Sequence, residues 1–183
     1  MSFKKWLFIT IFLFGIGIAF GLATPAGILS LISEDIAALQ EQFASILALP
    51  KPLIAIFIFL KNASVLLLSF LLSPILCLVP IVTLTINGWL IAFVSAAVVQ
   101  QESLGFVLAA LLPHGIFELP ALIIGQAAAL SFGTAAMLAL FRRGGKNRLI
   151  PSLKQNLKYL MLALALLLPA AIIEAYITPL LLT

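Results

Sequence analysis

The sequence predicts an all-helical membrane protein, a bundle that crosses the bilayer about five times. Hydrophobic residues make up 64% of the 183 residues and charged residues only 9%, against about 45–50% and about 25% in soluble domains. The apolar residues also gather in long runs, several of which reach the roughly 20 residues that span hydrocarbon. Since five such spans use about 100 residues, we expect residues 1–183 to form one domain surrounded by membrane lipid.

Composition also excludes several classes of function. Ten Lys plus Arg and six Asp plus Glu cannot cover the surface of a soluble enzyme or of a nucleic-acid-binding domain, so we expect no nucleic-acid partner. The lone cysteine, Cys77, excludes an intrachain disulfide and a multi-cysteine metal site. Asp35 is the only aspartate, and it gives no support to a Ser-His-Asp triad. We therefore expect a protein without catalytic residues.

The first apolar run, residues 6–23, follows Lys4 and Lys5. A signal peptide begins in the same way. The run is long for the apolar centre of a signal peptide, however, and Pro25 is poorly placed for cleavage after Ala23. We expect an uncleaved membrane span.

Residues 27–49 have a different pattern. Apolar side chains recur there at steps of three and four, with Ser, Asp, Glu and Gln between them, which predicts an amphipathic helix. The segment is too polar to span the bilayer, so it should lie at the outer membrane surface or against a partner. A helix that covers the bundle and a helix that binds another protein are both compatible with this pattern.

Three further runs are predicted to span the membrane on simple grounds of length. Residues 53–72 and 75–99 are separated only by the turn signal Ser73-Pro74, which predicts a tight hairpin. Residues 159–182 form the last span, because they again reach the required length.

The long apolar run at residues 104–141 needs a different explanation. As one straight helix, its 38 residues would extend about 57 Å, whereas the hydrocarbon core is only about 30 Å thick. The run is either two spans or a half-helix followed by one span. We predict a half-helix over residues 104–112, a break at Pro113, and a crossing over residues 114–141.

Charge placement decides between these alternatives and sets the orientation. Residues 142–158 contain six Lys and Arg and no acid. By the positive-inside rule this segment is cytoplasmic, as is the N-terminus with its two lysines. Three spans precede residue 104, so only one crossing within residues 104–141 returns the chain to the cytoplasm. The last span then places the C-terminus outside the cytoplasm.

Polar residues inside the apolar runs are the candidate functional residues. An ionisable side chain within the membrane costs about 2.5–3.5 kcal/mol on insertion scales, so it needs a partner. The predicted crossings place four such residues at similar depth in the outer half of the bilayer, and the apolar runs also contain the neutral polar residues Asn62, Asn87 and Gln126. This predicted cluster consists of Lys61, Asn62, Asn87, His114, Glu118 and Glu174.

The segment around His114 and Glu118 combines polar side chains with helix breakers. These two residues are four positions apart, so they project from the same face of a helix. Pro113 and Pro120 bracket them, and Gly115 lies between them. Prolines free backbone carbonyls, which within a membrane must be buried in protein or face water.

Three interpretations of this cluster remain open. Its members can bond one another and stabilise a corner of the bundle. They can instead line a wet pathway, in which a carboxylate serves as a proton or cation site of a small transporter or channel. Third, His114, Glu118 and Glu174 can supply the three protein ligands of a zinc-type site, although the common two-histidine zinc motif is missing. Apart from such a metal, we expect no cofactor.

Small residues mark two helix surfaces. They are Gly15, Gly17 and Gly21 in the first run, and Ala127, Ala128, Ala129, Ser131, Gly133, Ala135 and Ala136 in the fourth. Small side chains let helices approach closely. Such surfaces predict tight packing within the chain or self-association into a homo-oligomer.

The motifs resemble those of a known family. The pair Asn87-Gly88 in an apolar run, followed by PHGIFELPA at residues 113–121, resembles the stage II sporulation protein M family of integral membrane proteins. The residues that match its motif are His114, Gly115, Glu118 and Pro120. Lys61 departs from it, since the family pattern often has an asparagine there.

The resemblance implies a function as well as a fold. In spore-forming bacteria, members of this family are membrane scaffolds that act in engulfment of the forespore and recruit a peptidoglycan hydrolase. By resemblance, this chain is expected to be a non-enzymatic membrane scaffold or assembly factor. Its expected partners are membrane proteins or proteins that remodel the cell wall.

Overall fold

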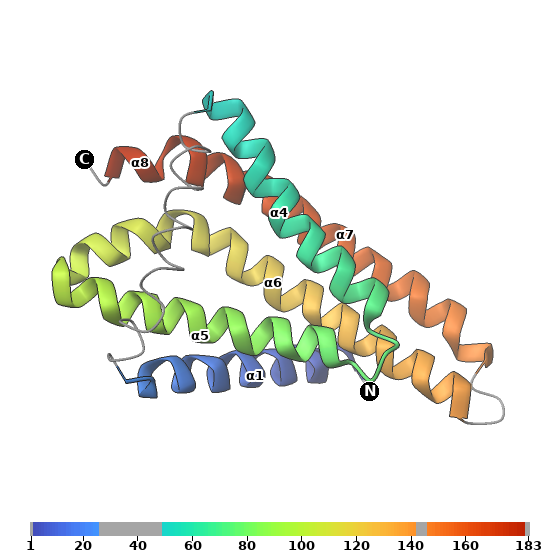
Figure 1. Ribbon diagram of the computed structural model, residues 1–183. Coiled ribbons are helices and arrows are strands. Elements are labelled where there is room, and N and C mark those ends of the chain that lie inside the picture. Colours follow the sequence, from blue (N-terminus) through green and yellow to red (C-terminus); the bar gives the residue numbers. More distant parts are fainter. Residues whose placement is uncertain (1, 26–48, 142–145, 182–183) are drawn as a thin grey trace.

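The computed structural model describes residues 2–25, 49–141 and 146–181, which form helices and contain no strand. Five of the helices are long and apolar enough to cross a membrane, which confirms the predicted fold class (Figure 1). The helices are α1 (Phe3–Ala23), α4 (Lys51–Leu72), α5 (Leu78–Gln101), α6 (Leu104–Phe141), α7 (Lys146–Tyr176) and the short α8 (Thr178–Leu181). The amphipathic helix predicted at residues 27–49 lies almost entirely outside the described residues.

The ends of the helices gather at two opposite ends of the bundle. Figure 1 shows the N-terminus, the α4–α5 turn and the end of α6 at one end, and the α5–α6 connection and the C-terminus at the other. Helix α6 therefore runs the length of the bundle once, and its number of membrane crossings stays a prediction. Which end faces the cytoplasm stays a prediction.

Helix α6 differs from its prediction in one respect. The expected half-helix at residues 104–112 and the expected crossing at residues 114–141 form one continuous helix, with Pro113 and Pro120 inside it. The chain bends instead of breaking, and Figure 1 shows α6 changing direction in its first half. A proline removes one backbone hydrogen bond and its ring pushes the preceding turn away, which bends a helix that packing holds together on both sides.

Two helix boundaries also differ from those predicted. Helix α5 begins at Leu78 rather than near residue 75, because Leu76 and Cys77 have φ angles of 53° and 55°, which a right-handed helix cannot contain. Helix α7 begins at Lys146 and ends at Tyr176, whereas hydropathy predicted a span over residues 159–182. Hydropathy indicates only the part of a helix that lies in lipid. The basic residues at the start of α7 are already helical, so the helix begins earlier than the predicted span.

Helices α1 and α5 pack so closely that their backbones are in contact. Three glycines leave no room there for a methyl group: Gly17, Gly21 and Gly88. A Cβ added to Gly88 would collide with the carbonyl oxygen of Phe14. Gly15, by contrast, faces open space. Close helix approach is thus confirmed for two of the three glycines predicted in the first span.

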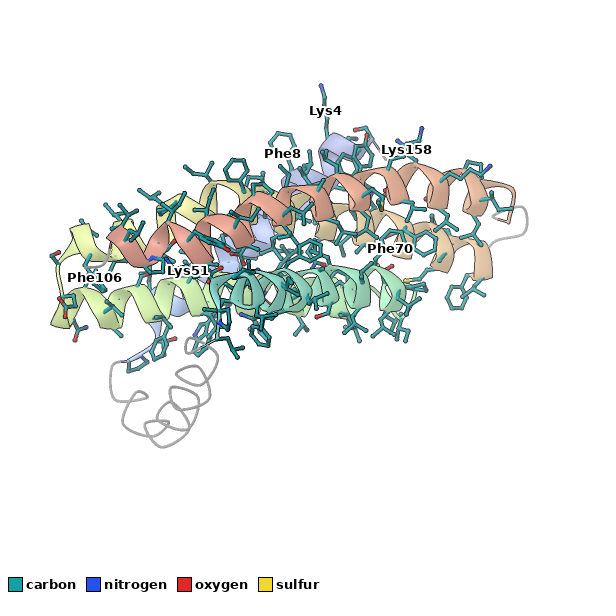
Figure 2. All side chains as sticks on the ribbon, turned by 90° about the horizontal axis from the view of Figure 1, so that it is seen from above. Lys4, Phe8, Lys51, Phe70, Phe106 and Lys158 are labelled. Atoms are coloured by element: carbon teal, nitrogen blue, oxygen red, sulfur yellow. The ribbon has the colours of Figure 1, made fainter. Side chains whose placement is uncertain are left out.

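The core of the bundle lies around the second half of α6. Ala127, Ala128 and Ala129 are fully buried, and Gly125 packs against Leu66 of α4 and Ala163 of α7. The small-residue surface of the fourth run is therefore used within the chain. The outer surface is apolar, as lipid contact requires; Phe8, for example, is 73% exposed and projects from the bundle (Figure 2).

A polar cluster between helices α4, α6 and α7

Three ionisable side chains meet inside the bundle. One ligand atom each of His114, Glu118 and Glu174 lies within 4.8 Å of the others. Helix α6 supplies the first two because a spacing of four residues puts both on one face, and α7 supplies Glu174 close to its C-terminal end. All three side chains are half-buried. The structure thus brings together three of the residues that the predicted depths placed at one level.

Helix α4 closes the cluster with a hydrogen bond. Asn62 Nδ2 donates to Oε1 of Glu118 at 3.1 Å. A hydrogen bond to an ionised carboxylate is about twice as strong as one between neutral groups. The neighbouring Lys61 is exposed but interacts electrostatically with Glu118, since a lysine can extend its charged end away from the backbone.

The two carboxylates impose an electrostatic constraint. Glu118 and Glu174 repel each other when both are ionised. Because their nearest oxygens lie within 4.8 Å, the repulsion is at least about 3 kcal/mol at an effective dielectric constant of about 20. They therefore require a compensating positive charge or a shared proton. Within the described part of the chain, Lys61 and His114 are the groups that act on Glu118 with opposite sign.

One ring nitrogen of His114 has no hydrogen-bond partner in the described chain. Its Nδ1 is shielded from solvent and has no hydrogen-bond partner among the residues that the structure describes. A buried nitrogen without a partner costs about 1–3 kcal/mol. His114 thus has a buried nitrogen that no described residue satisfies, and one of its two ring nitrogens lies within 4.8 Å of a carboxylate oxygen of each glutamate.

The remaining predicted residues have other roles. Asn87 Nδ2 donates to the carbonyl oxygen of Thr83 in its own helix at 2.7 Å, and Gly88 packs against α1. Gly115 meets nothing closer than Leu119 at 4.0 Å, so packing does not require a glycine there. The motif residues therefore serve different parts of the bundle.

The prolines act on the backbone of α6 beside the cluster. Pro113 and Pro120 have no N–H to donate, so the carbonyls of Ala109 and Ile116 lose their usual helical partners. The turns that contain the cluster therefore each lack a backbone hydrogen bond that a regular helix would have.

Gln126 was noted from the sequence as a polar residue in an apolar run, but the layer of hydrogen bonds around it was not predicted. Gln126 Nε2 donates to Ser69 Oγ at 3.1 Å, and Ser69 Oγ shares a hydrogen bond of 3.2 Å with Thr83 Oγ1. Gln126 is fully buried, and its Oε1 has no partner in the described chain. The sequence spacing could have predicted this layer. Ser69 lies seven residues after Asn62, and Gln126 lies eight residues after Glu118. Each is therefore about two helical turns from a residue of the first cluster, on the same side of its helix.

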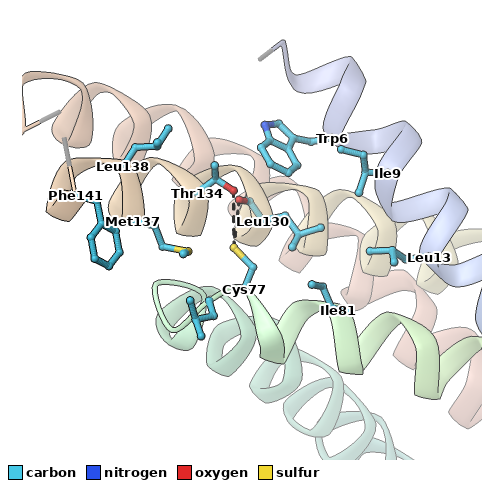
Figure 3. Close-up of a pocket in the computed structure, with 11 residues that line it drawn as sticks. Trp6, Ile9, Leu13, Cys77, Ile81, Leu130, Thr134, Met137, Leu138 and Phe141 are labelled. Carbon is cyan, nitrogen blue, oxygen red and sulfur yellow. Dashed lines mark hydrogen bonds between the residues drawn. The ribbon is translucent and has the colours of Figure 1, made fainter.

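A hollow elsewhere in the described bundle has no such chemistry. It is an apolar groove of about 430 Å³ between α1, the turn before α5 and the second half of α6, with Trp6 and Met137 in its lining (Figure 3). Its lining includes the thiol of Cys77, the hydroxyl of Thr134 and the indole of Trp6, and Cys77 Sγ lies 3.8 Å from Thr134 Oγ1. The groove matches the apolar character of lipid and holds no set of titratable side chains.

Comparisons with known proteins agree with the motifs. Residues 9–179 match the family model described as Stage II sporulation protein M. An uncharacterized protein of Methanocaldococcus jannaschii, MJ0793, is 28% identical over 178 residues, which cover 94% of this chain and 93% of the relative. A second uncharacterized protein of that organism, MJ0706, is 29% identical over 110 residues, which span 59% of this chain and half of the relative. No solved structure matches. The chain therefore belongs to the stage II sporulation protein M family.

Proposed function

We propose that this protein is a non-enzymatic membrane scaffold, which holds other membrane proteins or cell-wall-remodelling proteins in place. The observation that carries the proposal is the two-sided character of α1. Its inner face is locked to α5 through Gly17, Gly21 and Gly88, while its outer face presents large side chains that touch little of the bundle. These include Phe8, Phe12 and Phe20, which are 66–73% exposed.

Such a helix suits the recognition of another transmembrane helix. Aromatic side chains bury much area with few rotatable bonds and dominate the energetics of many interfaces. Because α1 is fixed from behind, its outer face keeps one shape and needs no rearrangement on binding. The occupant we propose is a transmembrane helix of a membrane protein that acts on the cell wall.

Site-specific photo-crosslinking tests this proposal. A photoreactive amino acid at Phe12 should form a discrete crosslink to a membrane or cell-wall-remodelling protein in intact cells, identified by mass spectrometry. The matched control is Thr10, which is fully buried in the same helix and should give no crosslink to another protein. Replacing Phe8, Phe12 and Phe20 together by leucine should abolish partner capture without loss of folded protein. Crosslinks to lipid alone from every outward position would contradict a scaffold role.

The polar cluster favours a second candidate, a small transporter or channel. His114, Glu118 and Glu174 lie on bundle helices near a proline-bent stretch, which is where membrane proteins place ion sites. This function predicts ion- or pH-dependent flux in liposomes that Glu118→Gln and Glu174→Gln abolish, whereas Glu102→Gln at the exposed α5–α6 connection leaves it unchanged. Wild-type liposomes without flux across a panel of ions and a pH gradient would exclude transport.

A further inference from the structure

We propose that His114, Glu118 and Glu174 bind one divalent metal ion of the zinc class, which joins helix α6 to helix α7. This inference does not depend on a scaffold role, since a metal that stabilises the bundle would be equally compatible with transport. It rests on the donor set, on the spacing of its atoms and on the hydrogen bond that holds one donor in place.

The spacing is close to that of a metal site. The three donor atoms lie within 4.8 Å of one another, whereas donors about 2.0–2.2 Å from a tetrahedral zinc ion are about 3.3 Å apart. Rotation about side-chain torsions can close that difference, because Glu has three of them and both carboxylates lie at the ends of their side chains. The backbones need not move, and the packing between α6 and α7 around Ala163 holds them in register.

The charges also favour a divalent cation. The site combines two carboxylates, whose mutual repulsion requires a positive charge or a shared proton, with an imidazole whose buried Nδ1 has no partner in the described chain. A metal ion would satisfy both conditions at once by replacing the proton and accepting a lone pair of the imidazole. Lys61 alone could compensate one carboxylate electrostatically, but it offers nothing to the imidazole.

The donor types indicate which metals fit. Imidazole nitrogen suits zinc, copper, iron and nickel, while magnesium and calcium prefer sites made only of oxygen. One imidazole and two carboxylates supply three protein ligands, which is the number in catalytic zinc sites, where the fourth position is left for water or another ligand. We therefore expect Zn²⁺ to bind far more tightly than Mg²⁺ or Ca²⁺, with Co²⁺ as a spectroscopic substitute.

Asn62 is the positioning residue of this site. It donates to Oε1 of Glu118, which fixes the orientation of the carboxylate and leaves Oε2 for the metal. Groups that orient a metal ligand in this way commonly change metal affinity by about 10–100-fold when they are replaced. Asn62→Ala should therefore weaken binding by about 10–100-fold while one metal ion still binds at saturating concentration, an effect that loss of a ligand would not give.

Metal analysis of the intact protein tests the proposal. The protein is purified in mild detergent without a polyhistidine tag, treated with a chelator and equilibrated with Zn²⁺. We expect one zinc per chain, a higher unfolding temperature with zinc than with chelator, and visible Co²⁺ absorption that zinc displaces. Glu174→Gln should lose stoichiometric zinc, and Glu102→Gln, which removes an exposed carboxylate, should keep it.

The outcomes separate the metal site from a purely structural cluster. Where a ligand variant fails to fold, the Co²⁺ spectrum of the wild-type protein still reports whether imidazole and carboxylates bind the ion. A wild-type protein that holds less than one zinc per chain and shows no Co²⁺ absorption would overturn the proposal. Unchanged zinc stoichiometry in folded Glu174→Gln would overturn it as well. Neither result affects the crosslinking from α1, so the scaffold proposal would stand or fall separately.

Discussion

Asn62 on α4 and Glu118 on α6 are 56 positions apart in the chain and are joined by a hydrogen bond of 3.1 Å. Each residue alone is costly to place in a membrane, and each satisfies the other. The bond also ties α4 to the bent part of α6, where Pro113 and Pro120 have removed backbone hydrogen bonds. The amide of Asn62 thereby supports the turns of α6 that hold His114 and Glu118.

Loss of this hydrogen bond should destabilise the bundle. Asn62→Ala leaves the carboxylate of Glu118 with one donor fewer, and bonds to charged groups contribute about 1.5–3 kcal/mol. We expect the free energy of unfolding to fall by about 1–2 kcal/mol, measured by denaturation in mixed detergent micelles. Asn87→Ala is the matched control, because the amide of Asn87 donates only within its own helix, and it should cost clearly less. An equal fall in the free energy of unfolding in both variants would show that the Asn62–Glu118 hydrogen bond adds no stability beyond that of a hydrogen bond within one helix.

The gathering of His114, Glu118 and Glu174 could be predicted from the sequence for a physical reason. Lipid makes unpaired polar groups expensive, so polar residues that the topology puts at one depth tend to find one another. Counting crossings gave that depth. The same reasoning grouped Asn87 with them, although depth alone says nothing about which way a helix face points. The side chain of Asn87 donates a hydrogen bond within α5.

The Ser69–Thr83–Gln126 layer could not be predicted in the same way. Ser and Thr can satisfy themselves against their own helix backbone, so their presence in an apolar run does not require a partner. Hydropathy also missed two helix boundaries. The start of α5 at Leu78 depends on the geometry of the preceding turn, and the start of α7 at Lys146 belongs to a part of the helix that extends beyond the predicted span.

The contact between α1 and α5 should be intolerant of a single methyl group. Gly88→Ala would place a Cβ against the carbonyl oxygen of Phe14, a backbone atom that cannot move unless the helices separate. Overpacking of this kind costs about 1–3 kcal/mol. We expect a lower unfolding temperature for Gly88→Ala and Gly17→Ala. Gly15→Ala, which faces open space in the same helix as Gly17, should be neutral or slightly stabilising because alanine favours helix; a loss there equal to that of Gly17→Ala would refute the close-contact explanation.

Two substitutions of Gln126 should separate the cost of burying its unsatisfied polar atom from the contribution of its side-chain volume to packing. Its Oε1 is buried and without a partner in the described chain, while Ser69 can keep its hydrogen bond to Thr83 without it. Gln126→Met retains the volume and removes the unsatisfied oxygen, so we expect stability unchanged or raised by about 1 kcal/mol. Gln126→Ala leaves a cavity and should cost about 2 kcal/mol or more. A large loss for Gln126→Met in thermal unfolding would show instead that the amide is satisfied and stabilising.

The orientation of the bundle can be tested at its two ends with cysteine labelling. The native Cys77 is buried and burial raises the pKa of its thiol, so the folded wild-type protein should react slowly with maleimides. In a Cys77→Ala background, Lys154→Cys and Glu102→Cys place single exposed thiols in the first part of α7 and on the α5–α6 connection. Figure 1 shows the start of α7 and that connection at opposite ends of the bundle. Because basic segments stay in the cytoplasm, a membrane-impermeant maleimide added to intact cells should label Glu102→Cys and should reach Lys154→Cys only after permeabilisation.

The reverse labelling pattern would show that the protein has the opposite orientation, with the His114–Glu118–Glu174 cluster in the cytoplasmic half of the bilayer. Labelling of both thiols in intact cells would contradict a single crossing by α6.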